Sequence, residues 1–381
     1  MNFDLTEEQQ MIVDAVAKFV DNDSPVTRFR ELRTTETGWD AKVWQQMGEY
    51  GWLAVGFPEE HGGYGGSFVD TALILEQFGR TLVPEPYIAS VVLAGELLSR
   101  LGSAEQIAAY LAPMTEGRTS LALAYAEKQS RYNVLDCVAR AERHGEGYVL
   151  NGEKVWVLNG HAADHIVVVA RTAGSQCDRD GLTLFVVDGD APGLTRTPVK
   201  GMDGQTTALL RLDGVEVGAD RRLGDEGAAA PELERVIDRG AAAACAEAQG
   251  NLNCMFTSTV EYLRERKQFG RAIGSFQALQ HKAADMFAET ELCKSAMILA
   301  AIGADDDDAA ARAGAVSAAK LQFADGGWFV QENAVQLFGG IAITDEQDVG
   351  LFFKRVRVLN GLFGDADYHV DRYANLETFA A

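Results

Sequence analysis

The feature that most constrains the fold is a change in hydrophobic period that occurs twice along the chain. Over residues 1–118 and 229–381 the apolar residues recur at helical spacing. Residues 119–228 instead hold short alternating or β-branched runs, separated by turn-forming pairs such as Asn151-Gly152 and Asn159-Gly160. We therefore expect an α+β protein with an N-terminal helical domain, a middle β-sandwich or β-barrel and a C-terminal helical bundle, with these boundaries.

Charge and cysteine usage narrow the classes of function. The formal net charge is −22, and an acidic surface repels nucleic-acid backbones, so nucleic acid is not an expected partner. The five cysteines have no CxxC spacing, and His161 and His165 fall in a connection between strands, so we expect reduced thiols and no metal site. Because no apolar run approaches the ~20 residues of a membrane span and no signal peptide is evident, we expect a soluble, cytoplasmic protein.

Several short motifs carry a resemblance to a known family. In chain order they are Pro58-Glu59-Glu60-His61-Gly62-Gly63, Glu76-Gln77-Phe78-Gly79-Arg80, Leu150-Asn151-Gly152-Glu153-Lys154-Val155-Trp156, Arg266-Lys267-Gln268-Phe269-Gly270 and Gln336-Leu337-Phe338-Gly339-Gly340. Together they resemble the acyl-CoA dehydrogenase family over nearly the whole chain. The resemblance implies that family's fold, in which the C-terminal domain is a four-helix bundle, and FAD as a cofactor bound between subunits.

The resemblance also implies which residues bind FAD. Arg266 can fork onto phosphate oxygens, Phe269 can lie against the apolar part of the cofactor, and Gly339 and Gly340 let the backbone approach closely. The Gly339-Gly340 pair taken alone is also typical of a helix C-cap, and Trp156 taken alone is also typical of a β-domain core. The full expected set is Arg266, Gln268, Phe269, Gln277, Gln336, Leu337, Gly339, Gly340, Glu127 and Trp156.

The sequence departs from the family where the chemistry takes place. The reaction needs a carboxylate that removes the α-proton of the acyl group and a donor that polarises the thioester carbonyl. Ala126 stands where the family has a threonine whose hydroxyl serves the flavin ring. Phe363 and Gly240 occupy the two positions at which family members carry the catalytic glutamate. The main-chain amide of Phe363 can still polarise a carbonyl, because that contact needs no particular side chain.

One nearby glutamate is a candidate for the missing base. Glu247 lies seven residues beyond Gly240 on an alanine-rich helix, so both share one helix face. The alternative for Glu247 is a buried structural carboxylate paired with an arginine. Asp365 and Asp367 are second choices for the base and equally suit the start of a last helix.

These departures from the family pattern all fall in one part of the predicted site. Motifs that hold a neighbour's FAD are intact, whereas those that serve this chain's own flavin ring are eroded, as in subunits of bacterial heteromeric acyl-CoA dehydrogenases for steroid side chains or dicarboxylic acyl chains. We therefore expect a subunit of an α2β2 enzyme that acts on an acyl-CoA, with a related acyl-CoA dehydrogenase subunit and an electron-transfer flavoprotein as partners. Two alternatives stay open: a non-catalytic partner that completes the FAD site of a related chain, and a homomeric flavin oxidase or monooxygenase.

Overall fold

Residues 4–376 are described by a computed structural model, and they divide into two units. Unit 1 comprises the chain up to Glu31, Phe68–Val83 and the chain from Ala241 onward, whereas unit 2 comprises Leu32–Ser67 and Pro84–Gly240. Each unit is thus assembled from segments that are distant in the sequence. The predicted domain boundaries divide the chain into three consecutive segments, which these two units do not test, so the boundaries stay a prediction.

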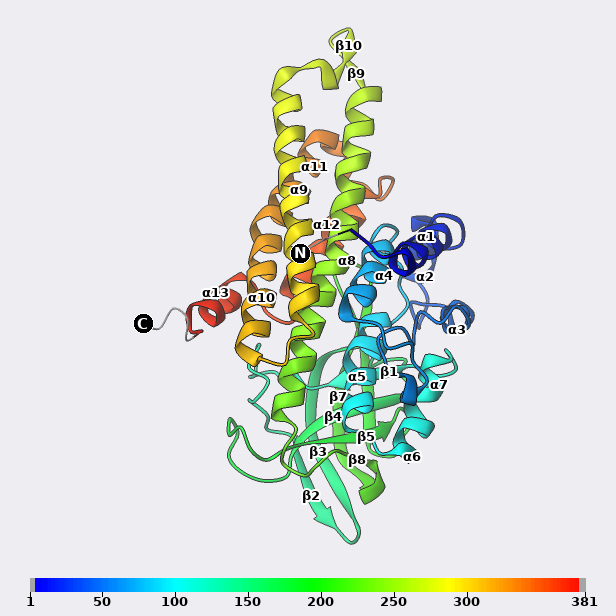
Figure 1. The fold of residues 1–381 in the computed structure, drawn as a ribbon, viewed down its shortest axis with the longest axis vertical. Helices are drawn as coiled ribbons and strands as arrows, with labels where there is room; N and C mark the ends of the chain where they lie inside the picture. The colour runs from blue at the N-terminus through cyan, green and yellow to red at the C-terminus, as the bar shows by residue number, and fades with distance from the viewer. Residues whose placement is uncertain (1–3, 377–381) are drawn as a thin grey trace. The chain divides into compact units, whose positions relative to one another are not determined.

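Unit 1 is helical, as the 3.6-residue period of its apolar residues predicts. Its helices are α1 (Glu7–Asn22), α2 (Val26–Leu32), α4 (Phe68–Gly79), α8 (Ala230–Glu265, which begins in unit 2), α9 (Gln277–Gly303), α10 (Ala309–Gln322), α11 (Trp328–Phe338), α12 (Val349–Gly361) and α13 (Ala366–Ala374). The β-hairpin β9 (Lys267–Gln268) and β10 (Arg271–Ala272) connects α8 to α9 at the far end of these two long helices (Figure 1).

Two glycines allow α4 to pack closely against α8. A Cβ atom on Gly79 would lie 2.1 Å from the carbonyl oxygen of Glu247, and one on Gly250 would lie 1.9 Å from that of Glu76. Both distances are far below a van der Waals contact, so neither position accepts a side chain without a shift of the helices. This crossing explains the glycine of the Glu76–Arg80 motif.

Unit 2 contains an eight-stranded sheet in which β6, β7, β3, β2, β4, β5 and β8 are neighbours in that order and β1 pairs with β4. The strands are β1 (Leu121–Ala124), β2 (Arg140–His144), β3 (Gly147–Leu158), β4 (His165–Arg171), β5 (Leu182–Asp188), β6 (Leu194–Lys200), β7 (Thr206–Gly218) and β8 (Arg222–Leu223). Helices α3 (Ala41–Glu49), α5 (Glu96–Leu101), α6 (Ala104–Gln106) and α7 (Ala112–Thr115) complete this unit. The predicted α+β class is confirmed.

One expected turn is absent from the middle unit. Asn159-Gly160 follows the end of β3 as predicted, but Asn151-Gly152 lies within β3, where the register with β7 shifts. The side-chain Oδ1 of Asn151 accepts a hydrogen bond from the backbone N–H of Gly214 at 2.8 Å. A glycine-containing pair therefore marks a β-bulge here rather than a chain reversal, because both devices use a glycine conformation that other residues avoid. Among the described residues, no helix is both long enough and apolar enough to cross a membrane.

Candidate functional site

The first group of predicted site residues lies at the hairpin between α8 and α9. Phe269 and Gly270 form its two-residue turn, with φ angles of +53° and +80°. Positive φ at both central residues is the geometry of a type I′ turn, which asparagine and glycine adopt more easily than phenylalanine. The ring of Phe269 is 91% exposed. An aromatic ring held at such an exposed and conformationally costly position is typical of a surface that receives a ligand.

The second group lies at the end of α11. Gly339 ends this helix with a φ of +71°, so the C-cap interpretation holds for this residue. A Cβ atom on Gly339 or Gly340 would meet nothing within 4 Å, and the Gln336 side chain is exposed, whereas Leu337 is buried. The face of this motif is therefore open.

An aromatic stack joins the two groups. The ring of Tyr262, near the end of α8, stacks on that of Phe338 with centroids 4.5 Å apart and an interplanar angle of 18°. Arg266 follows Tyr262 by one helical turn, is exposed, and has no ion pair within residues 4–376. A free guanidinium, an exposed ring and bare glycine backbone fit the phosphates and the flat ring system of FAD. Gln268 and Gln277 are exposed in the same connection between α8 and α9.

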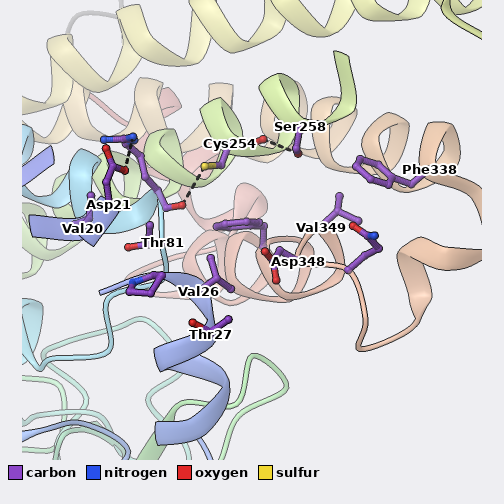
Figure 2. Close-up of a pocket in the computed structure, with 14 residues that line it drawn as sticks. Val20, Asp21, Val26, Thr27, Thr81, Cys254, Ser258, Phe338, Asp348 and Val349 are labelled. Atoms are coloured by element: carbon purple, nitrogen blue, oxygen red, sulfur yellow. Dashed lines mark hydrogen bonds and ion pairs between the residues drawn. The ribbon is translucent and has the colours of Figure 1, made fainter. Parts of the chain in front are cut away.

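Unit 1 also contains a cleft of about 400 Å³ (Figure 2). Phe338 lines it, together with an ion pair between Arg80 and Asp21 at 2.9 Å and with the Cys254 thiol, which donates to the Arg80 carbonyl. Burial raises the pKa of Cys254 to about 11, so this thiol is protonated and unreactive at neutral pH. None of the predicted site residues lines the cleft.

In unit 2, Trp156 is presented to solvent by a second bulge. The register between β3 and β7 shifts between Lys154 and Val157, and Trp156 has a φ of +54°. Its ring is 60% exposed, so it does not belong to the core of the sheet. This placement leaves one face of the ring available to a flat partner.

The buried carboxylate of Glu127 connects several segments of unit 2. Glu127 accepts hydrogen bonds from Lys154 Nζ at 2.7 Å and from the backbone N–H groups of Val138 and Ala139 at 2.8 and 3.0 Å. Burial acts to raise the pKa of Glu127, but Lys154 and these donors outweigh it and hold the pKa at about 2. With its oxygens engaged inside unit 2, Glu127 fixes the loop that the cofactor would meet; its carboxylate does not point into open space.

Glu247 takes part in a buried ion pair. Its Oε1 and Oε2 accept from Nε and Nη2 of Arg355, on α12, at 2.6 and 2.8 Å. The two side chains are only 7% and 8% exposed. This is the structural arrangement that the sequence left open as the alternative to a catalytic base. Glu247 is enclosed in this pair and does not line the cleft beside Phe338.

The loop after α12 holds Phe363 in a left-handed conformation, with a φ of +60°. Within the described residues its backbone N–H donates to no acceptor, although the residue as a whole is buried. An N–H group without a partner in the described chain is available to donate to a ligand. The neighbouring Asp365 accepts from Tyr368 N–H at 3.0 Å and so is the N-cap of α13, which is the alternative that its sequence position allowed.

Sequence reasoning missed the basic partners of these groups. Arg355 and Lys154 are both nearly fully buried, and each lies among apolar residues on the inner face of its element. Arg355 is four residues from both Leu351 and Leu359, which are buried on α12. A basic residue at an apolar position of a helix is the signal that predicts a buried acidic partner.

Comparisons with known proteins agree with these observations. The chain matches models of the N-terminal, middle and C-terminal domains of acyl-CoA dehydrogenase over residues 6–118, 122–215 and 232–375. The Bacillus subtilis protein named Probable acyl-CoA dehydrogenase YngJ is 30% identical over 364 residues, which are 94% of this chain and 95% of that protein.

Two solved structures are similar over almost their whole length. The ChsE4-ChsE5 complex from Mycobacterium tuberculosis is 28% identical, with a TM-score of 0.87 and coverage of 98% of this chain and 97% of that chain. A variant of the Tcur3481-Tcur3483 steroid ACAD is 29% identical, with a TM-score of 0.87 and coverage of 98% and 99%.

Proposed function

Because this chain belongs to the acyl-CoA dehydrogenase family, we propose that it is one subunit of a heterotetramer that introduces an α,β double bond into an acyl-CoA thioester. Its predicted fold class and its membership of an oxidoreductase family are confirmed by the family match. FAD is the cofactor of this family, as the sequence predicts. The subunit composition, the substrate and the roles of single residues are the proposed part.

The observation that carries the proposal is the enclosure of the candidate base Glu247 in a buried ion pair. Phe363 and Gly240 occupy the two positions where a catalytic glutamate is expected, and Glu247 is held by two guanidinium nitrogens of Arg355. A carboxylate that is enclosed in a buried ion pair is not presented to a substrate. We therefore assign proton removal to a related partner subunit.

This chain contributes the clamp for the adenine and phosphate end of the partner's cofactor. Arg266 would bind phosphate oxygens through its planar fork, Phe269 would lie against the apolar part of the cofactor, and Gly339 and Gly340 would admit it close to the backbone. Bound FAD would accept the hydride that leaves the β-carbon of the acyl chain. Within unit 1, the Phe363 amide would donate to the thioester carbonyl of a bound acyl-CoA, which would make the α-proton more acidic. Trp156, in unit 2, stays a proposed contact of the flavin ring.

The substrate and the partners can be proposed only by class. The similarity to a steroid ACAD supports a bulky acyl group, and an electron-transfer flavoprotein is the proposed electron acceptor. The alanines of α8 near Glu247 are buried, and none of them lines the cleft beside Phe338. The five cysteines, none of which forms a disulfide, suit a cytoplasmic location.

Substitution of Glu247 tests the assignment of the base. In the mixed assembly with a related subunit, Glu247→Gln should leave the turnover per folded, flavin-loaded enzyme within about twofold of wild type. A loss of about a hundredfold or more with flavin retained would instead make Glu247 the base of this chain's own site.

A further inference from the structure

The loop that carries Phe363 rests on one buried lysine. Lys320, in the last turn of α10, is 2% exposed. Its Nζ donates to the carbonyl oxygens of Leu359 at 2.9 Å, Asn360 at 3.0 Å and Leu362 at 2.8 Å. An ammonium group has three hydrogens, so all of its donors are used at the end of α12 and the start of the loop that follows.

The first two of these bonds end a helix. Leu359 and Asn360 lie in the last turn of α12, where carbonyl groups have no partner within the helix. A cation at this end also complements the negative end of the helix dipole. The Asn360 side chain donates to the Phe323 carbonyl at 3.1 Å and adds a second tie between this end of α12 and the segment after α10.

The third bond reaches the functional group itself. The Leu362 carbonyl and the Phe363 N–H are the two ends of one peptide group, which is planar and trans. The N–H therefore points away from the carbonyl, and so away from Lys320. Fixing the carbonyl fixes the direction of the N–H, and a cation at the carbonyl polarises the peptide so that its N–H becomes a stronger donor.

The other side of the loop is equally fixed. A Cβ atom on Gly364 would lie 2.4 Å from Nε2 of His369, and His369 is itself buried and bonded through Nδ1 to Ser317 Oγ at 3.1 Å. Ser317 precedes Lys320 by one turn of α10, so one face of this helix holds both sides of the loop. The loop is therefore a preset shape and not a segment that must order on binding.

From this geometry we propose that Lys320 is a positioning residue, which aims and strengthens the Phe363 N–H as the donor to the thioester carbonyl of the acyl-CoA. This role rests on the acyl-CoA site of the proposed function. It assigns a task to a buried cation that otherwise is only a helix cap. Lys320 should therefore raise the affinity only of ligands that have the thioester carbonyl.

Two ligands that differ only at the carbonyl test this proposal. The thioester 2,2-dimethylbutyryl-CoA has no α-hydrogen and cannot react, and S-(2,2-dimethylbutyl)-CoA is the thioether in which a methylene replaces the carbonyl. Calorimetric titration of the flavin-loaded assembly should show that wild type binds the thioester about tenfold more tightly, which is the affinity gain of one good hydrogen bond. In Lys320→Met this preference should fall to about twofold or less, with thioether affinity unchanged.

Two further variants make the outcome decisive. Lys354→Met removes an exposed lysine of α12 and should keep the wild-type preference. If Lys320→Met does not fold, Lys320→Gln, which retains two donors, should give an intermediate preference. A full thioester preference in the Lys320 variants, or an equal loss for both ligands, overturns the positioning role. Wild type that binds neither ligand refutes the acyl-CoA site, and with it this inference; wild type that binds both equally refutes the amide contact alone.

Discussion

The buried pair of Glu247 and Arg355 should make a large contribution to the stability of unit 1. Both side chains are less than a tenth exposed, and two charge-assisted hydrogen bonds of 2.6 and 2.8 Å join them. Removing one partner leaves the other charge buried without compensation, which typically costs ~3–5 kcal/mol. Glu247→Gln should therefore lower the free energy of unfolding by about 3 kcal/mol or more.

An exposed pair with the same bidentate geometry provides the control. Arg179 and Glu234 are joined by hydrogen bonds of 2.6 and 2.7 Å, but their side chains are 55% and 29% exposed. Because water already solvates these charges, Glu234→Gln should cost about 1 kcal/mol or less. The difference between the two losses in stability reports the effect of burial, because the hydrogen-bond geometry of the two pairs is similar.

Denaturant unfolding, followed by far-UV circular dichroism on the same preparation, measures both variants. The double variant Glu247→Gln with Arg355→Met should recover at least half of the loss of the single variant, because no charge then remains buried alone. A Glu247→Gln variant within about 1 kcal/mol of wild type would refute the reasoning, since the pair would then be no stronger than a surface contact.

Three further predictions concern titration and flavin binding. Lys154→Met should destabilise the chain at pH 7, and its difference in stability from wild type should shrink as pH falls from 4.5 towards 2. The reason is that Glu127, whose pKa is held at about 2, stabilises the fold fully above pH 4.5 and loses this contribution towards pH 2. Urea unfolding at pH 7 and 3.5 measures the difference, and a value independent of pH would contradict this reasoning. Burial and the nearby Lys320 lower the pKa of His369 to about 3, so its contribution to stability is complete above pH 6.5 and is lost as pH falls towards 3. His369→Gln should accordingly flatten the pH dependence of unfolding over that interval, and an unchanged slope would argue against it. Arg266→Ala should lower the flavin content of the mixed assembly, whereas the neighbouring Lys267→Ala should not; equal flavin content in both would remove Arg266 from the clamp.

Local chemistry explains what the sequence could predict. The motif Arg266–Gly270 forms the hairpin turn between α8 and α9, which the sequence pattern did not predict, and Gly339 ends α11 as the C-cap interpretation predicts. The helical and β periods likewise follow from which face of each element is buried. The fold class could therefore be predicted without knowing which elements are neighbours, whereas the binding of FAD by these two motifs stays a prediction.

The contacts that decide the chemistry depend on neighbours that are distant in the sequence. Arg355 is 108 residues from Glu247, and Lys320 is 42 residues from Leu362. No periodic spacing in the sequence predicts either pairing, because each one connects segments whose contact depends on the tertiary structure. The sequence could thus name Glu247 as either a base or a structural carboxylate, and only the position of α12 places an arginine against it.

The central claim is that this chain completes a cofactor site together with a related subunit, and the flavin-to-protein ratio tests it most directly. The chain should be purified alone and after co-expression with a related acyl-CoA dehydrogenase chain. The account predicts a colourless chain alone and about half a FAD per chain in the mixed assembly, one for each pair of unlike subunits. A chain that alone carries about one FAD, bleached by an acyl-CoA, would contradict the account and show a competent site within copies of this chain.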